Sequence, residues 1–128
     1  MGADSRTVEE IVAEDAQTLE RLSLSAATVA KRLRWADQKA RAALGAPVAL
    51  APGIEARHYE SMGRVPSPFR GDGVFPKGET RIVWDDGRQV RATALGIALI
   101  ERHGFFQGRG APYRIEPEQA ATLPAEEG

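Results

Sequence analysis

The sequence contains no cysteine and only two histidines, and these absences narrow the chemistry that the protein can perform. Without thiolates, disulfide scaffolds, cysteine-ligated zinc sites and cysteine nucleophiles are excluded. His58 and His103 are too few to supply a site with several histidine ligands. We therefore predict a protein that uses no metal ion and no other cofactor.

Long apolar runs are also missing from the 128 residues. The N-terminal residues lack the apolar core of a signal peptide, and Arg6 stands where a myristoylation signal needs serine or threonine. We therefore expect a cytoplasmic protein that does not enter a membrane. Hydrophobic residues make up 42% of the chain, which is too many for a disordered protein and suits one globular domain.

The chain as a whole has almost no net charge, but its charges are segregated. The total is −1, whereas residues 1–30 carry −4, residues 31–114 carry +7 and residues 115–128 carry −4. Fourteen of the 17 basic residues are arginine, whose planar group suits phosphates and guanine edges. A basic middle segment is typical of polyanion binding. The alternative is that these charges form an ordinary solvated surface and that the excess of arginine over lysine reflects a GC-rich coding genome.

The N-terminal third predicts two amphipathic helices. A capping box opens a helix from Val8 to Leu22, and Ser25 caps a second helix over about residues 26–44, which Gly45 ends. Because each helix carries an apolar stripe, the pair also offers an interface for a homodimer.

The junction of these helices resembles the second half of a helix-turn-helix, in which the second helix presents its N-terminal residues to the major groove. The resemblance implies that Thr28, Lys31 and Arg32 contact double-stranded DNA. The sequence departs from the motif at Leu19, where a small residue is usual, and at Ser23, where glycine is common. The alternative is an antiparallel helical hairpin whose apolar faces simply pack together.

Residues 46–79 give weaker signals. Residues 48–50 are a candidate strand, and residues 54–59 are either a strand or a helical turn. Residues 62–78 contain three prolines and four glycines, which predicts a loop. Within this loop Phe69 and Phe75 are candidate anchors for a protein partner, and an exposed Trp35 on the second helix would be another.

Residues 80–93 give the clearest strand signal and predict a hairpin. A three-residue loop over residues 85–87 gathers the apolar side chains, Trp84 among them, on one face and leaves Arg81 and Arg91 on the other. A two-residue turn would mix apolar and charged side chains on both faces, so we prefer the first register. Arg81 and Arg91 are candidate phosphate contacts, and the alternative is a solvated sheet face.

The C-terminal third predicts one more helix and one more hairpin. Thr93 caps a helix that ends at His103, although the apolar run is also compatible with a buried strand. Residues 105–115 predict a hairpin whose glycine-rich tip resembles the wing of winged-helix proteins. This resemblance implies that Arg109 reaches a phosphate or the minor groove, and the alternative is an ordinary glycine turn. We expect one domain over residues 1–115, followed by an acidic tail, residues 116–128, that frays.

Signals for catalysis are weak, because His58 and Glu60 resemble an acid–base pair but no nucleophile accompanies them. We therefore expect a protein that is not an enzyme. The predicted fold class is α+β, with an N-terminal helical pair, a small antiparallel sheet of two hairpins and one further helix. The first functional hypothesis is a small nucleic-acid-binding protein, such as a bacterial or phage DNA-binding regulator or accessory factor. The alternative is a non-enzymatic interaction or assembly module, such as a phage structural or inhibitory protein, that uses residues 62–79.

Overall fold

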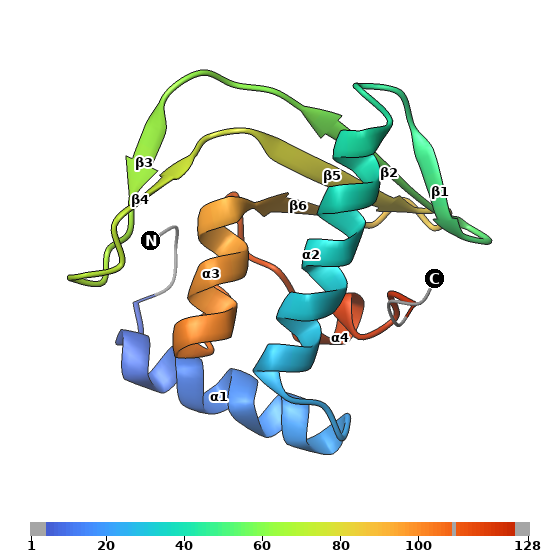
Figure 1. The fold of residues 1–128 in the computed structure, drawn as a ribbon. Helices are drawn as coiled ribbons and strands as arrows, with labels where there is room; N and C mark the ends of the chain where they lie inside the picture. The colour runs from blue at the N-terminus through green and yellow to red at the C-terminus, as the bar shows by residue number, and fades with distance from the viewer. Residues whose placement is uncertain (1–4, 109, 125–128) are drawn as a thin grey trace.

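The computed structural model describes residues 5–108 and 110–124 and confirms the α+β class (Figure 1). Thr7 and Glu10 form the predicted capping box at the start of the first helix, and Ser25 caps the second. In chain order the elements are α1 (Val8–Arg21), α2 (Ala26–Ala42), β1 (Val48–Ala51), β2 (Ile54–Tyr59), β3 (Arg64–Pro66), β4 (Val74–Pro76), β5 (Glu79–Trp84), β6 (Gln89–Thr93), α3 (Ala94–His103) and α4 (Pro117–Ala120).

The main sheet is antiparallel and has the strand order β1-β2-β5-β6. The β5–β6 hairpin has the predicted register, since Ile82 pairs with Val90 and the Trp84 N–H donates to the Arg88 carbonyl at 2.9 Å. Gly87 takes the left-handed conformation, with φ at 93°. A side chain would be strained there, which is why the three-residue loop needs glycine.

Residues 60–78 connect β2 to β5 and form a curved extension of the sheet, which we call the arm (Figure 1). The expectation of a loop here was wrong in part, because β3 and β4 pair as a separate two-stranded sheet with Val65 opposite Phe75. Pro66 and Pro76 stand at strand ends, where the missing N–H of proline is tolerated.

The core lies between the sheet and α2, and α2 and α3 lie on the same side of the sheet (Figure 1). The packed face of α2 is built mostly from small residues, which allows the helix to approach the sheet and α3 closely. Thr93 caps α3 and Gly104 ends it in the left-handed conformation, so the helix prediction is confirmed against the buried-strand alternative. The buried residues of α2 are Val29, Ala30, Leu33, Ala36 and Ala40.

The expected hairpin over residues 105–115 is wrong, because the described residues there contain no strand. Phe105 and Phe106 are each 1% exposed and serve as core anchors. The Ile115 N–H donates to the Phe106 carbonyl at 3.2 Å, a link that holds this irregular segment without a ladder. Arg109, the residue assigned to the tip, lies outside the described residues.

The expected fraying from residue 116 onward also differs from the structure. Residues 117–120 form α4, and Ala120 and Leu123 are buried in the main core. Arg32 in α2 donates hydrogen bonds to the carbonyls of Ala121 at 3.1 Å and Leu123 at 3.4 Å. The domain therefore extends through the last described residues, because this segment closes one end of the core.

Candidate functional site

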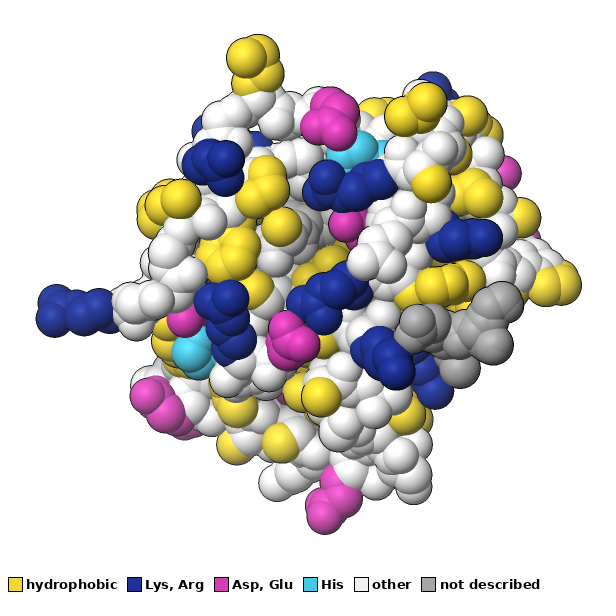
Figure 2. Space-filling model, in the orientation of Figure 1, with side chains coloured by type: hydrophobic (Ala, Val, Ile, Leu, Met, Phe, Trp, Pro, Cys, Tyr) yellow, Lys and Arg dark blue, Asp and Glu magenta, His cyan; other side chains and the backbone are white. Residues whose placement is uncertain are grey.

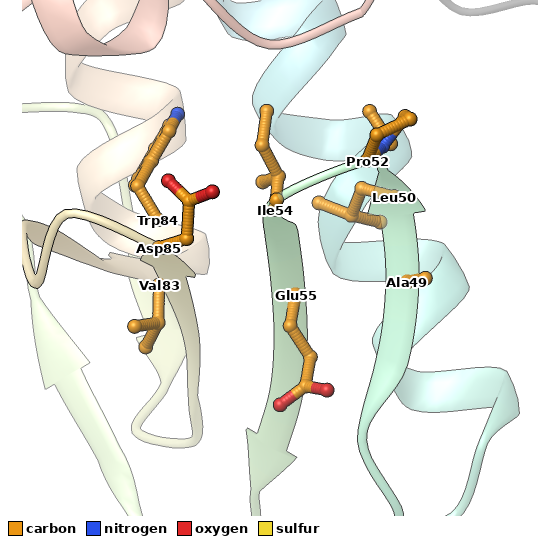
Figure 3. A pocket seen from close by; sticks show the side chains of 10 residues that line it. Ala49, Leu50, Pro52, Ile54, Glu55, Val83, Trp84 and Asp85 are labelled. Atoms are coloured by element: carbon orange, nitrogen blue, oxygen red, sulfur yellow. The ribbon is translucent and has the colours of Figure 1, made fainter.

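The strands of the main sheet present two different faces. In β2 the residues alternate between buried and exposed. At the end of the sheet Ile54 and Trp84 point together one way, toward the core, whereas Glu55 and Val83 point together the other way (Figure 3). We call this second side of β2, β5 and β6 the outer face. Its residues are Glu55, Arg57, Tyr59, Glu79, Arg81, Val83, Gln89, Arg91 and Thr93.

The shallow hollow at this end of the sheet has a volume of about 700 Å³ and lies beside the β1–β2 turn (Figure 3). Its charged lining side chains are Glu55 and Asp85, and the rest is mostly apolar. Glu55 and Asp85 point to opposite sides of the sheet (Figure 3), so they form no carboxylate pair, and the lining contains no basic side chain that would bind an anion.

Three arginines occupy directly opposed positions on adjacent strands of the outer face. Arg57 on β2 pairs with Arg81 on β5, and Arg81 pairs with Arg91 on β6. We call these three residues the arginine row. Like charges placed directly opposite each other destabilise an antiparallel sheet. The row therefore requires a compensating anion.

Glu79 is the internal anion of the arginine row. Its carboxylate accepts hydrogen bonds from Arg81 Nε at 2.7 Å and from Arg91 Nε and Nη2, both at 2.9 Å. Tyr113 donates a further bond at 3.3 Å. The Glu79 side chain is only 10% exposed. Hydrogen bonds from Arg91 and then Arg81 lower the pKa of Glu79 from 4.5 to about 2, against the opposing effect of burial.

One carboxylate compensates only part of the charge of the arginine row. Arg57 has no carboxylate partner among the residues that the structure describes, and its Nε donates to the Gly45 carbonyl at 2.6 Å. Even when Glu55 is counted, the charged residues of the outer face sum to a positive charge. The row is thus a cationic surface that Glu79 holds in place and does not neutralise.

Two tyrosine rings support the guanidinium groups. The Arg81 guanidinium carbon lies 4.5 Å from the centre of the Tyr59 ring, and that of Arg57 lies 5.6 Å from the same ring. The Arg91 carbon lies 4.7 Å from the Tyr113 ring. Cation–π contacts of this kind fix the plane of a guanidinium group without consuming its hydrogen-bond donors.

A pocket of about 530 Å³ adjoins the arginine row between the outer face and the arm. Tyr59 and Tyr113 stand on its walls, and Glu79 and Arg81 belong both to it and to the site described above. Its remaining lining residues come from the arm, from the start of α3 and from the loop after it: Glu60, Ser61, Val65, Pro76, Lys77, Thr93, Leu95 and Gln107.

The residues predicted from the helix-turn-helix resemblance are not part of this site. Thr28 is half-buried, with its hydroxyl 3.0 Å from that of Ser25, and Arg32 holds the C-terminal segment. Lys31 is exposed on α2. One side of α2 packs against α3, α4 and three strands and forms part of the core, while Lys31 stands on its exposed side. The contact of these residues with double-stranded DNA stays a prediction.

The predicted partner anchors are engaged within the molecule. Phe69 stacks on the His103 ring with centroids 3.8 Å apart, and it meets Phe105 edge-on at 5.9 Å. The Arg102 guanidinium lies 5.5 Å from the Phe75 ring. Trp35 is half-buried against the main core. These three aromatic residues therefore stabilise the fold and the position of the arm.

The basic side chains form no continuous stripe on the face shown in Figure 2. The described lysine and arginine side chains on this face stand as separate spots, several of them beside acidic side chains. Among the described residues, the predicted contacts fall into two separate groups: Arg81 and Arg91 on the sheet, and Thr28, Lys31 and Arg32 on α2. Ion pairs elsewhere join Arg34 to Glu101, Arg41 to Asp37, Arg88 to Asp86, Arg102 to Asp72 and Arg114 to Asp15.

His58 and Glu60 belong to a separate chain of polar groups that is buried at His58 and exposed at Glu60. His58 Nδ1 lies 2.9 Å from the Thr80 hydroxyl, and its Nε2 lies 3.1 Å from a Glu60 oxygen. Thr80 donates to Asp37 in α2 at 2.7 Å. Since Thr80 is fully buried, its hydroxyl is closed to a substrate. The chain of bonds joins the inner face of the sheet to α2.

Comparisons with protein-family models, with curated proteins and with solved structures found no match to this chain. Within residues 5–108 and 110–124, no group of three histidine, aspartate or glutamate side chains is placed to hold a metal ion. In the same part of the chain, no helix combines the length and the apolar character needed to span a bilayer.

Proposed function

We propose that the protein binds nucleic acid through the arginine row on the outer face of its sheet. The observation that carries the proposal is the direct opposition of Arg57, Arg81 and Arg91 on adjacent strands, with one buried carboxylate among them. Such a row is unfavourable alone, and phosphate oxygens, like carboxylate oxygens, match the hydrogen-bond donors of guanidinium groups.

The structure of the row also favours phosphate recognition over loose ion binding. The two tyrosine rings and Glu79 fix the guanidinium groups before a ligand arrives, so less side-chain entropy is lost on binding. Antiparallel sheets that carry basic and aromatic side chains on one open face are suited to nucleic acid strands. The proposal assigns binding and no catalytic step.

An interaction module that uses the arm is the second candidate function. It is favoured by the exposure of Met62 and Val74, at 94% and 56%, since exposed apolar side chains on a protruding segment suit a protein contact. The roles of regulator or accessory factor, the homodimer through α1 and α2 and the cytoplasmic location stay predictions.

The proposed function is tested by fluorescence anisotropy with labelled oligonucleotides between 50 and 200 mM salt. The key variant is Arg57→Gln, because within residues 5–108 and 110–124 that side chain has only a carbonyl and a ring as partners. Arg70→Gln is the matched control, with the same loss of charge at an exposed position of the arm.

We expect wild-type affinity to fall steeply with salt, and Arg57→Gln to reduce the slope of log K against log salt by about 0.7 to 0.9. Arg70→Gln should leave the slope unchanged. The proposal is overturned if the wild-type protein does not bind at the lowest salt, or if both variants lose affinity equally.

A further inference from the structure

The floor of the pocket beside the arginine row is formed by the next row of residues on the outer face. The row Arg57–Arg81–Arg91 is followed by the row Tyr59–Glu79–Thr93, two residues further along β2. Two residues of a strand span about 7 Å. A ligand that places a phosphate on the first row therefore brings its neighbouring group to the second row, which is the floor of the pocket.

The chemistry of the pocket suits a flat heteroaromatic ring. Val65 and Pro76 of the arm and Leu95 of α3 provide apolar contacts, and Tyr59 and Tyr113 provide aromatic ones. Gln107 adds an amide group that has no side-chain partner among the described residues. Ring stacking combined with an amide that both donates and accepts hydrogen bonds is how proteins hold an unpaired base.

Gln107 has an unusual backbone conformation at this position, with φ at 71°. A non-glycine residue in the left-handed region costs about 1 kcal/mol or more. Such strain persists where surrounding structure holds it in place. Here Arg114 donates to the Gln107 carbonyl at 2.8 Å, while the Gln107 side chain lines the pocket.

We infer that this pocket holds one unpaired nucleobase, so that the protein prefers single-stranded nucleic acid to duplex. A volume of about 530 Å³ lies in the usual range for small-ligand sites. Besides the sheet, the arm and the loop that carries Tyr113 contribute to the lining. A base inside a duplex stays stacked and cannot enter, whereas a base of a single strand can be turned out at low cost.

This inference rests on the proposed function, and its test separates the two. Three probes are used at one salt concentration: a labelled single-stranded ten-nucleotide DNA, the same sequence as a duplex, and adenosine monophosphate as a competitor. Val65 is half-exposed on β3 and lines the pocket, so the variant Val65→Trp is designed to fill the pocket. Val74→Trp is the control, because Val74 is exposed on β4 and lies outside the lining.

We expect wild-type protein to bind the single strand at least tenfold more tightly than the duplex, since stacking one base contributes about that factor or more. Val65→Trp should bring single-strand affinity down to the duplex level and leave duplex binding unchanged, and Val74→Trp should alter neither. Gln107→Ala, which leaves the pocket open, should weaken single-strand binding alone. Circular dichroism checks that each variant is folded.

Equal affinity for the single strand and the duplex in wild-type protein would overturn this inference and leave the proposed function standing. Binding to neither would overturn both. Adenosine monophosphate should displace the single strand only at concentrations far above the Kd of the strand. If it binds as tightly as the strand, the ligand is a free nucleotide and the preference for a strand is wrong.

Discussion

Replacing Glu79 with glutamine separates the structural role of the arginine row from its binding role. The Glu79→Gln variant keeps the size of the side chain but removes the negative charge between Arg81 and Arg91. The carboxylate stabilises the fold, yet it also competes with any phosphate for the same guanidinium groups. We therefore expect the variant to be less stable and to bind nucleic acid more tightly.

The loss of stability follows from the lowered pKa of Glu79, which falls from 4.5 to about 2. A shift of that size corresponds to about 3 kcal/mol of folding free energy. Because Arg81 and Arg91 keep 43% and 33% of their side-chain surface exposed, solvent screening reduces this to about 2 kcal/mol. The folded pKa lies below the unfolded one, so the stabilisation is complete above about pH 5 and is lost as the pH falls from 4.5 to 2.

The assay is urea unfolding of wild type and Glu79→Gln at pH 7 and at pH 2.5. The difference in the free energy of unfolding should be about 2 kcal/mol at pH 7 and should fall to about a quarter of that at pH 2.5. Glu55→Gln, on the same face but exposed, is the control and should change little at either pH. Equal destabilisation at both pH values would refute the electrostatic argument. Weaker nucleic acid binding by the variant would refute the competition between carboxylate and phosphate.

Two further predictions concern contacts outside the proposed interface. Arg114→Gln leaves Asp15 buried without its partner, since the two side chains are 9% and 4% exposed, and we expect the free energy of unfolding in urea to fall by about 3 to 5 kcal/mol. Arg88→Gln, which breaks an exposed ion pair, is the control and should leave stability nearly unchanged. A similar effect of the two substitutions would contradict this account. Asp72→Asn weakens the contacts that fasten the arm to His103 and Arg102, so trypsin should cleave faster after Arg70 at pH 8. The hydrogen bond from His103 lowers the pKa of Asp72 below 3.8, so acidification below about pH 4 should loosen the arm of the wild-type protein too. Unchanged cleavage in Asp72→Asn would show that stacking of Phe69 alone holds the arm.

The hairpin over residues 80–93 could be predicted because local signals agree there. The alternation of apolar side chains selects the three-residue loop, the glycine at position 87 fits the left-handed position of that loop, and the observed register is the same. The caps of α1, α2 and α3 were predictable for the same reason, since Thr7, Ser25 and Thr93 act on residues three positions away.

The helix-turn-helix resemblance does not determine how α2 is used, because its pattern does not distinguish an exposed helix from a core helix. Apolar residues at helical spacing together with a serine cap describe both. The two cases differ in which elements pack against the helix, and α2 packs against the sheet, α3 and α4. Arg32 shows the same limit: its charge predicts an exposed contact, yet its partners are carbonyls 89 and 91 residues away.

The proposed interface was predicted only in part for a related reason. Arg81 and Arg91 follow from the hairpin register, but the roles of Arg57 and Glu79 depend on how β2 pairs with β5 across the arm. The alternation over residues 54–59 places Arg57 on the same face as Tyr59, and this signal was available. No local pattern indicates that Tyr113, in an irregular segment, comes to lie beside Arg91 and Glu79.

The central claim is that the outer face of the sheet is the surface that meets nucleic acid. It is tested most directly by titrating ¹⁵N-labelled protein with a short single-stranded oligonucleotide and following the backbone amide signals. We predict that the largest shifts fall on Arg57, Arg81 and Arg91 and on Gln107, with little change in α2. Shifts confined to α2 or to the tip of the arm, or no shifts at all, would contradict the account.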